Sequence, residues 1–180
     1  MRLLPQYLVA VLKKNICLES TYDFVMKRQN QIAVQDAAAV LREVLAVTLA
    51  DLPVSNEMFA AACEEAAAKA NAAFLAASMN YQKHNAEIQP LLEAAMCQVL
   101  EEFKGKNLEA SDAKCKDVIT SLFGPVSALA ATFLKSGGYT ELTSKLNGIL
   151  DSYNRLSPDE LGPAKEGVLE NFMQDQVIQT

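Results

Sequence analysis

The sequence has no tryptophan and is poor in glycine, proline and histidine. Its 180 residues include seven glycines, six prolines and a single histidine, His84. Alanine, in contrast, is abundant. Alanine has the highest helix propensity, whereas glycine and proline have the lowest. The composition therefore favours helix over sheet.

Strong charge of either sign is also absent. The net charge is −6, charged residues make up 21% of the chain, and apolar residues make up 51%. These values are typical of a globular domain and not of a disordered tail. Because the excess charge is negative, we do not expect nucleic acid or an anionic lipid surface as a partner. A group of lysines can form a local basic spot, although such groups are most often solvated faces: Lys104, Lys106, Lys114 and Lys116.

The cysteines are widely spaced and form no CxxC pair, which disfavours a zinc site or a disulfide scaffold. They are Cys17, Cys63, Cys97 and Cys115. We interpret them as reduced, mostly buried thiols of a cytoplasmic protein. Residues 1–15 resemble a signal peptide only superficially, because Pro5 interrupts them and no cleavage pattern follows. We predict an amphipathic helix there. No apolar run approaches the roughly 20 residues that span a bilayer.

Apolar residues recur with helical spacing along almost the whole chain. The expected helical segments are 18–29, 33–50, 55–82, 85–104, a segment from Asn107 or Ser111 to 133, 139–153, and a last one to about 177. The connections are short, as between antiparallel helices. We therefore predict an all-α fold, an elongated and mostly antiparallel bundle of about six or seven helices. We expect residues 1–180 to form a single helical domain.

Local signals mark the ends of several predicted helices. Ser55 is a good N-cap, and Pro90 suits a first helical turn, where a missing N–H costs little. Gly105 is expected to end its helix. We expect Gly124–Pro125 to kink or break the next one, because proline removes a backbone hydrogen bond.

The segment near the C-terminus carries a second set of signals. Ser157 can cap a helix, Pro158 fits its first position, and Glu160 completes a capping box. Residues 162–163, Gly-Pro, should end that turn quickly. The apolar period of the final helix is still running at Thr180. We therefore expect the chain to be part of a longer molecule.

The stretch FLKSGGYTELTSKL, residues 133–146, invites comparison with a phosphate-binding loop. Such a loop needs GxxxxGK[ST], and here Tyr and Thr follow Gly137–Gly138 while Lys135 precedes them. Gly105–Lys106 is followed by Asn and also fails the pattern. Residues 136–138 therefore predict a helix end and a tight turn into an antiparallel partner.

No constellation of catalytic or metal-binding residues is apparent. His84 has no nearby cysteine or carboxylate cluster, and we expect it to be exposed in a turn. The pairs Glu64–Glu65 and Glu101–Glu102 are adjacent, so their side chains point about 100° apart on a helix and cannot form a carboxylate dyad. The cysteines lack a paired base. We predict no catalytic residue, no cofactor-binding residue and no metal site.

Four pieces of the sequence occur in an order and spacing that resemble one family. They are LPVSNEMF (52–59), KNLEASDAKC (106–115), SGGY (136–139) and PAKEGVLENFM (163–173). Together they are similar to the helical middle and C-terminal domain of the guanylate-binding proteins, which are dynamin-like large GTPases related to the atlastins. The resemblance covers roughly residues 19–178, with the first helix pair followed loosely, chiefly through Glu19 and Asn30.

The individual matches differ in quality. The family piece Asn-x-Glu-Ala-Ser…Cys is matched by Asn107, Glu109, Ala110, Ser111 and Cys115. The family corner Pro-Gly-Gly-Tyr is matched by Gly137, Gly138 and Tyr139, with Ser136 in place of proline. The basic piece Pro-Arg-Lys-Gly is kept only as Pro163, Lys165 and Gly167.

The resemblance implies a helical stalk that works with a GTPase domain in cis or in trans, in GTPase-linked innate immune defence. It carries over no site residues, because the family hydrolyses GTP through a separate domain whose motifs have no counterpart in this sequence. A homo-oligomer is a further possibility that the resemblance allows. The alternative from another class is a stand-alone helical module for protein–protein interaction. An enzyme in its own right is disfavoured by the lack of an acid/base or nucleophile constellation.

Overall fold

The computed structural model describes residues 18–79, 81–127 and 138–178, and within these residues it has six α-helices and no β-strand. The helices are α2 (Leu18–Thr48), α3 (Asn56–Ala77), α4 (Tyr81–Ser127), α6 (Gly138–Arg155), α7 (Pro158–Leu161) and α8 (Lys165–Ile178). The predicted all-α class is confirmed. The predicted N-terminal helix lies outside the described residues, and of the predicted glycine corner only Gly138 is described, where it begins α6.

The chain divides into two compact units. Unit 1 consists of residues 1–44 and 65–99, and unit 2 consists of residues 45–64 and 100–180. The helices α2, α3 and α4 therefore contribute residues to both units.

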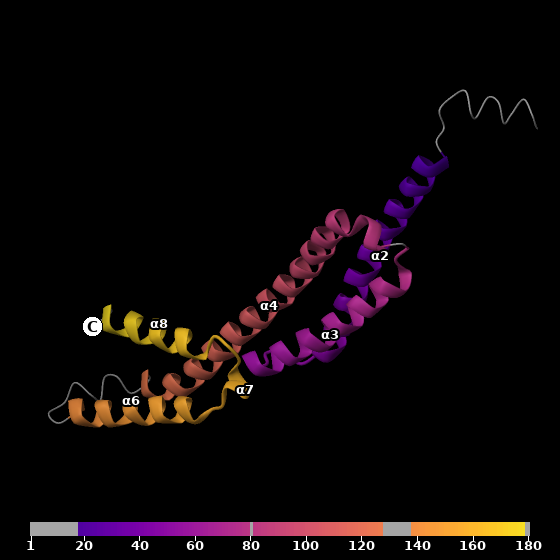
Figure 1. Ribbon diagram of the computed structural model, residues 1–180. Coiled ribbons are helices and arrows are strands. Elements are labelled where there is room, and N and C mark those ends of the chain that lie inside the picture. The colour runs from indigo at the N-terminus through magenta and orange to yellow at the C-terminus, as the bar shows by residue number, and fades with distance from the viewer. Residues whose placement is uncertain (1–17, 80, 128–137, 179–180) are drawn as a thin grey trace, which may run out of the picture. The chain divides into compact units, whose positions relative to one another are not determined.

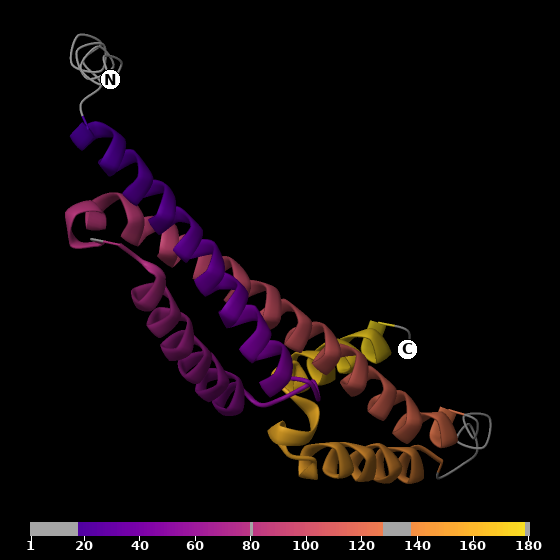
Figure 2. The same ribbon diagram turned by 90° about the vertical axis from the view of Figure 1, so that its right-hand side faces the viewer.

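Unit 1 contains three helical segments that run side by side (Figures 1 and 2), with α3 opposite in direction to α2 and α4. Their inner faces repeat every three to four residues. The buried apolar side chains are Met26, Ala33, Val34, Ala37 and Leu41 of α2, Ala66, Ala70 and Phe74 of α3, and Ile88, Leu92 and Val99 of α4. Alanines on the inner face of α3 let the neighbouring helices approach closely.

Asn30 explains two differences from the predicted helix boundaries in unit 1. Segments 18–29 and 33–50 were expected to be separate, but α2 runs without interruption from Leu18 to Thr48. Asn30 is a fully buried polar residue on the inner face of α2, so it interrupts the apolar period and not the helix. Its side chain binds both backbone groups of Met79, accepting from the N–H at 2.8 Å and donating to the carbonyl at 3.1 Å.

The contact with Met79 also accounts for where α3 ends. The predicted segment 55–82 ends early, because α3 stops at Ala77 and α4 begins at Tyr81. No glycine or proline marks this reversal in the sequence. The backbone groups that leave the helix there are satisfied by Asn30, a residue 49 positions away. The predicted N-cap at the other end is confirmed, since the Ser55 hydroxyl accepts from the N–H of Met58.

Helix α4 is continuous at two positions where a helix end or an interruption was predicted. It passes through Gly105, which was expected to end a helix, and through Gly124–Pro125 to Ser127, so the helix is not broken at Gly124–Pro125, where a kink or a break was expected. Pro90 is the tenth residue of α4 and not part of its first turn. A glycine inside a helix costs only about 1 kcal/mol relative to alanine, which the rest of a 47-residue helix readily offsets.

Unit 2 has its own apolar core, formed by α4, α6, α7 and α8. Its buried members are Cys115, Ile119, Tyr153, Leu161 and Val168. Phe123 and Phe172 pack edge to face beside it, with ring centroids 5.3 Å apart. The predicted capping box is confirmed: the Ser157 hydroxyl accepts from the N–H of Glu160, and the Glu160 carboxylate accepts from the N–H of Ser157.

Candidate functional site

The most elaborate polar arrangement in unit 2 lies on one face of α4, at Asn107, Ser111 and Cys115. These residues are spaced by four, which places them above one another on a helix. All three are buried. They face two connections of unit 2 that have no regular structure, namely residues 52–55 before α3 and residues 162–164 between α7 and α8.

Asn107 holds the first connection through Val54. Its amide oxygen accepts from the Val54 N–H at 2.8 Å, and its amide nitrogen donates to the Val54 carbonyl at 3.0 Å. The backbone at Val54 is buried and lies outside any helix, so it needs partners from elsewhere in the protein. The carboxamide of Asn107 offers one donor and one acceptor in the required arrangement.

Ser111 holds the second connection. Its hydroxyl donates to the Leu161 carbonyl at 2.5 Å and accepts from the Ala164 N–H at 2.9 Å. One turn further along α4, the Cys115 thiol lies 3.6 Å from the same Leu161 carbonyl. Consecutive turns of α4 therefore bind the backbone where α7 ends and α8 is about to begin.

The two connections meet at Gly162. Its φ of 76° is in the left-handed region that favours glycine. A Cβ atom at this position would lie 2.8 Å from the Pro53 Cβ and 2.8 Å from the Ser111 Oγ. Only a residue without a side chain lets the two connections and α4 approach this closely. We call Asn107, Ser111, Gly162 and the backbone that they bind the loop anchor.

Tyr153 fixes the start of α8 from α6. Its side chain is fully buried, and its hydroxyl donates to the Lys165 carbonyl at 2.9 Å. Burial, and secondly the neighbouring Cys115 thiol, raise the pKa of the Tyr153 phenol above its ordinary value. The Lys165 ammonium in turn donates to the carbonyls of Asn154 and Leu156 at the end of α6. The start of α8 is thus tied to both α4 and α6.

An open groove lies beside the loop anchor, between α4 and α8. Its volume is about 490 Å³, and its lining residues are Leu108, Glu109, Asp112, Pro163, Ala164, Gly167, Val168 and Asn171. A smaller groove of about 170 Å³ continues past Lys116, Ile119 and Phe172. Asp112 is ion-paired with Lys116 at 2.7 Å. The linings of the two grooves contain no histidine, cysteine or serine.

The residues singled out in the sequence are dispersed in the structure. Three lysines of the expected basic spot are ion-paired with acidic residues of α4: Lys104 with Glu101, Lys106 with Glu102 and Lys116 with Asp112. Glu65 pairs with Lys69, not with its neighbour Glu64. The basic spot and the glutamate pairs are therefore ordinary charged helix surfaces.

His84 and the cysteines also lie apart from the loop anchor. The expectation that His84 is exposed is wrong, because it is buried in the first turn of α4 within unit 1. Cys115 is buried, Cys63 is partly buried and Cys97 is exposed, so the expectation of mostly buried thiols holds only in part. No group of three or more metal-ligating side chains occurs in the part of the chain that the structure describes.

Asn107 and Ser111 were predicted as alternative N-caps, which is wrong, since both lie inside α4. Their type and their spacing in Asn-x-x-x-Ser-x-x-x-Cys were the available signal, because three small polar residues on one helix face imply a polar partner. Their actual partners, Val54, Leu161 and Ala164, are 46 to 53 residues away. No local pattern identifies such partners.

The fold and the loop anchor define an all-α helical domain whose buried polar groups serve packing. The sequence matches the family description "Guanylate-binding protein, C-terminal domain" over residues 2–180. The chain therefore belongs to the guanylate-binding protein family and represents its C-terminal helical domain, as the resemblance predicted. No curated protein matches the chain at a significant level. Within the described residues, none of the helices has the length and apolarity that crossing a membrane would require.

Proposed function

We propose that this chain is the non-catalytic helical stalk of a guanylate-binding-protein-like large GTPase. The observation that carries the proposal is the family match along residues 2–180. The stalk would pack against a GTPase domain, in cis or in trans, and transmit changes that follow nucleotide binding and hydrolysis. The nucleotide site would lie outside this chain. The inferred setting is GTPase-linked innate defence in the cytoplasm, and a homo-oligomer is one form that the assembly can take.

The geometry of unit 2 supports a mechanical role. A transmitting element has to hold its connections rigidly, and here α4 binds the backbone of both connections through Asn107 and Ser111. The hydroxyl of Tyr153 adds a third tie, to the start of α8. These side chains are occupied with backbone groups of the chain itself. Their hydrogen bonds support the packing of unit 2.

Calorimetry with the purified chain tests the proposal directly. Titration with GTP in the presence of Mg²⁺ is expected to give no stoichiometric binding. Tight binding at one GTP per chain would contradict the proposal. The matched control is a GTPase of known affinity titrated under the same conditions, which shows that the assay detects binding.

The reading frame upstream of Met1 separates the stalk from a stand-alone interaction module. A stalk acting in cis requires that this frame encode GxxxxGK[ST], the motif whose backbone N–H groups hold the phosphates. If the motif is absent, a partner in trans has to be sought, by passing a nucleotide-loaded GTPase of the family over the immobilised chain. Failure of both tests would favour the stand-alone module.

A further inference from the structure

The groove between α4 and α8 in unit 2 has the size and shape of a peptide-binding surface. Its volume is about 490 Å³, and binding sites typically enclose roughly 300–1,000 Å³. The smaller groove shares Val168 and Asn171 with it, and the two together follow α4 from Leu108 to Thr120. That span is about 18 Å along a helix. An elongated, open groove suits a peptide segment better than a small molecule, because a small ligand needs enclosure over most of its surface.

The lining of the larger groove is largely apolar. Val168 is buried, Pro163 and Ala164 are half-buried, and Leu108 at the edge is 52% exposed. Gly167 lies in helix α8, and a Cβ atom there would meet nothing within 4 Å. The surroundings of Gly167 therefore leave space for a side chain, although glycine is a poor helix former. The same space can receive an apolar side chain from a partner.

One wall of the groove is held in place by the loop anchor. The N–H of Ala164 donates to the Ser111 hydroxyl at 2.9 Å, and that hydroxyl donates to the carbonyl of Leu161. Pro163 lies between these two bonded residues and lines the groove. Binding to a surface that is already fixed costs little conformational entropy. The groove is therefore preformed.

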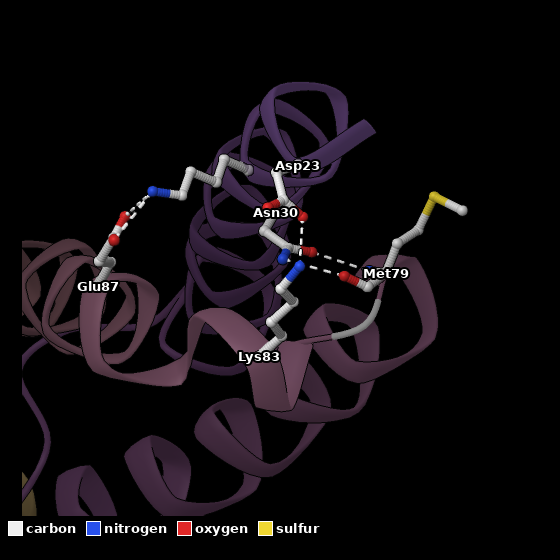
Figure 3. Close-up of polar contacts among 6 residues, drawn as sticks. Asp23, Asn30, Met79, Lys83 and Glu87 are labelled. Carbon is white, nitrogen blue, oxygen red and sulfur yellow. Dashed lines mark hydrogen bonds and ion pairs between the residues drawn. The ribbon is translucent and has the colours of Figure 1, made fainter. Parts of the chain in front are cut away.

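The charge in the lining is predominantly negative. The larger groove is lined by two carboxylates, Glu109 and Asp112, and Asp112 is ion-paired with Lys116 at 2.7 Å. In unit 1, Glu87 is likewise bound by Lys27 at 2.9 Å (Figure 3). Glu109 is exposed and has no basic partner among the residues that the structure describes. Its carboxylate is available to a cation from a partner.

We propose that this groove is a docking site for a basic amphipathic helix of a partner protein. Apolar side chains three to four residues apart on that helix would lie against Val168 and in the space above Gly167. A lysine or arginine beside them would pair with Glu109. A second copy of this chain suits the groove less well, because its net charge is also −6. The groove would bind such a helix whether or not the chain works with a GTPase domain.

Fluorescence anisotropy with the full chain tests the proposal. The probe is a labelled amphipathic peptide of leucine and lysine with roughly 15 residues, a length at which a helix can form. A peptide with glutamate in place of lysine is the control for charge. The lysine peptide should bind at least tenfold more tightly than the glutamate peptide. Equal binding of the two peptides, or no binding of the lysine peptide, would overturn the proposal.

Two variants locate the binding on the surface. Gly167→Leu fills the groove and should weaken binding of the lysine peptide by about tenfold or more. Glu109→Gln removes the free carboxylate and should weaken binding by several-fold, with a smaller loss at high salt. The matched controls are Gly148→Leu in α6 and Glu64→Gln in α3, both at exposed positions, and they should bind as the wild type does. Equal affinities of Gly167→Leu and Gly148→Leu would contradict the proposal.

NMR of the methyl groups and sedimentation velocity give two readouts that do not depend on the affinity of a variant. The lysine peptide should shift the methyl signals of Leu108 and Val168 and leave that of Leu41 in unit 1 unchanged. Shifts of equal size at all three residues would count against a site in the groove. Sedimentation of the chain alone should show no dimer that Gly167→Leu abolishes. Such a dimer would mean that a second copy occupies the groove, and the proposal would be wrong.

Discussion

Asn107 and Val54 are joined by two hydrogen bonds in which a side-chain amide pairs with both polar groups of one backbone residue. The pairing resembles the exchange of bonds between two residues of an antiparallel sheet, although one partner here is a helix side chain. The connection between α2 and α3 is thereby held against α4 at a distance of 53 residues in sequence.

Replacing Asn107 by alanine should destabilise the chain by about 2–4 kcal/mol, because it leaves the N–H and the carbonyl of buried Val54 without partners. Urea unfolding monitored by circular dichroism measures the loss. Asn147→Ala in α6 is the matched control, since Asn147 is exposed. Its effect should stay within about 0.5 kcal/mol. Equal effects at the two positions would show that the Asn107 bonds contribute little.

Gly162→Ala should lower the free energy of unfolding by more than about 2 kcal/mol. The new Cβ would lie 2.8 Å from both the Pro53 Cβ and the Ser111 Oγ, and the backbone already has a φ of 76°. Gly148→Ala is the control, because Gly148 lies within α6 and a Cβ there meets nothing within 4 Å. That control should stabilise the chain by up to about 1 kcal/mol. Thermal unfolding distinguishes the two signs, and a tolerated Gly162→Ala would show that the loops can separate.

Tyr153→Phe should lower the free energy of unfolding by about 1 kcal/mol, because it removes the hydrogen bond to the Lys165 carbonyl. The substitution should also change how the stability of the chain depends on pH above pH 9. The raised pKa of Tyr153 means that its contribution is complete below pH 10 and is lost as the pH rises further. The free energy of unfolding, measured from pH 9 to pH 11, should therefore fall less steeply for the variant than for the wild type. Tyr139→Phe, at a position that is 80% exposed, should leave the slope unchanged.

Lys83→Met should raise the pKa of the Asp23 carboxyl towards its ordinary value, because the hydrogen bond from Lys83 is the main cause of its lowering. Since that pKa is lowered in the folded state, the contribution of Asp23 to stability is present above about pH 4 and is lost below it. Carbon-detected NMR of the carboxyl group between pH 2 and pH 6 measures the change. Glu65, which pairs with Lys69 on α3, serves as the internal reference, and the pKa of its carboxyl group should not change.

Helical periodicity predicted much of this fold because each helix buries a face of its own. The capping box at Ser157 and the end of α7 at Gly162 both depend on residues within a few positions of one another. Local patterns are sufficient where the partners are local.

Helix boundaries were mispredicted where glycine and proline were treated as decisive. Gly105 and Pro90 lie inside α4, whereas the reversal after Ala77 has neither residue. A single weak helix former costs about 1–3 kcal/mol, and the packing of a long helix against its neighbours can exceed that cost. Asn30 lies on α2 and binds the backbone of Met79 just after the end of α3. No local sequence pattern shows this contact.

The amino-acid sequence by itself determined that the described part of this chain is mostly helical, which faces of its helices are apolar, and to which family it belongs, because periodicity and motif spacing are properties of the chain alone. Only the tertiary structure decided that Asn107 and Ser111 bind two distant connections and that His84 is buried. Backbone groups that leave a helix accept any partner of suitable geometry, and that partner is selected by which segments the folded core brings together.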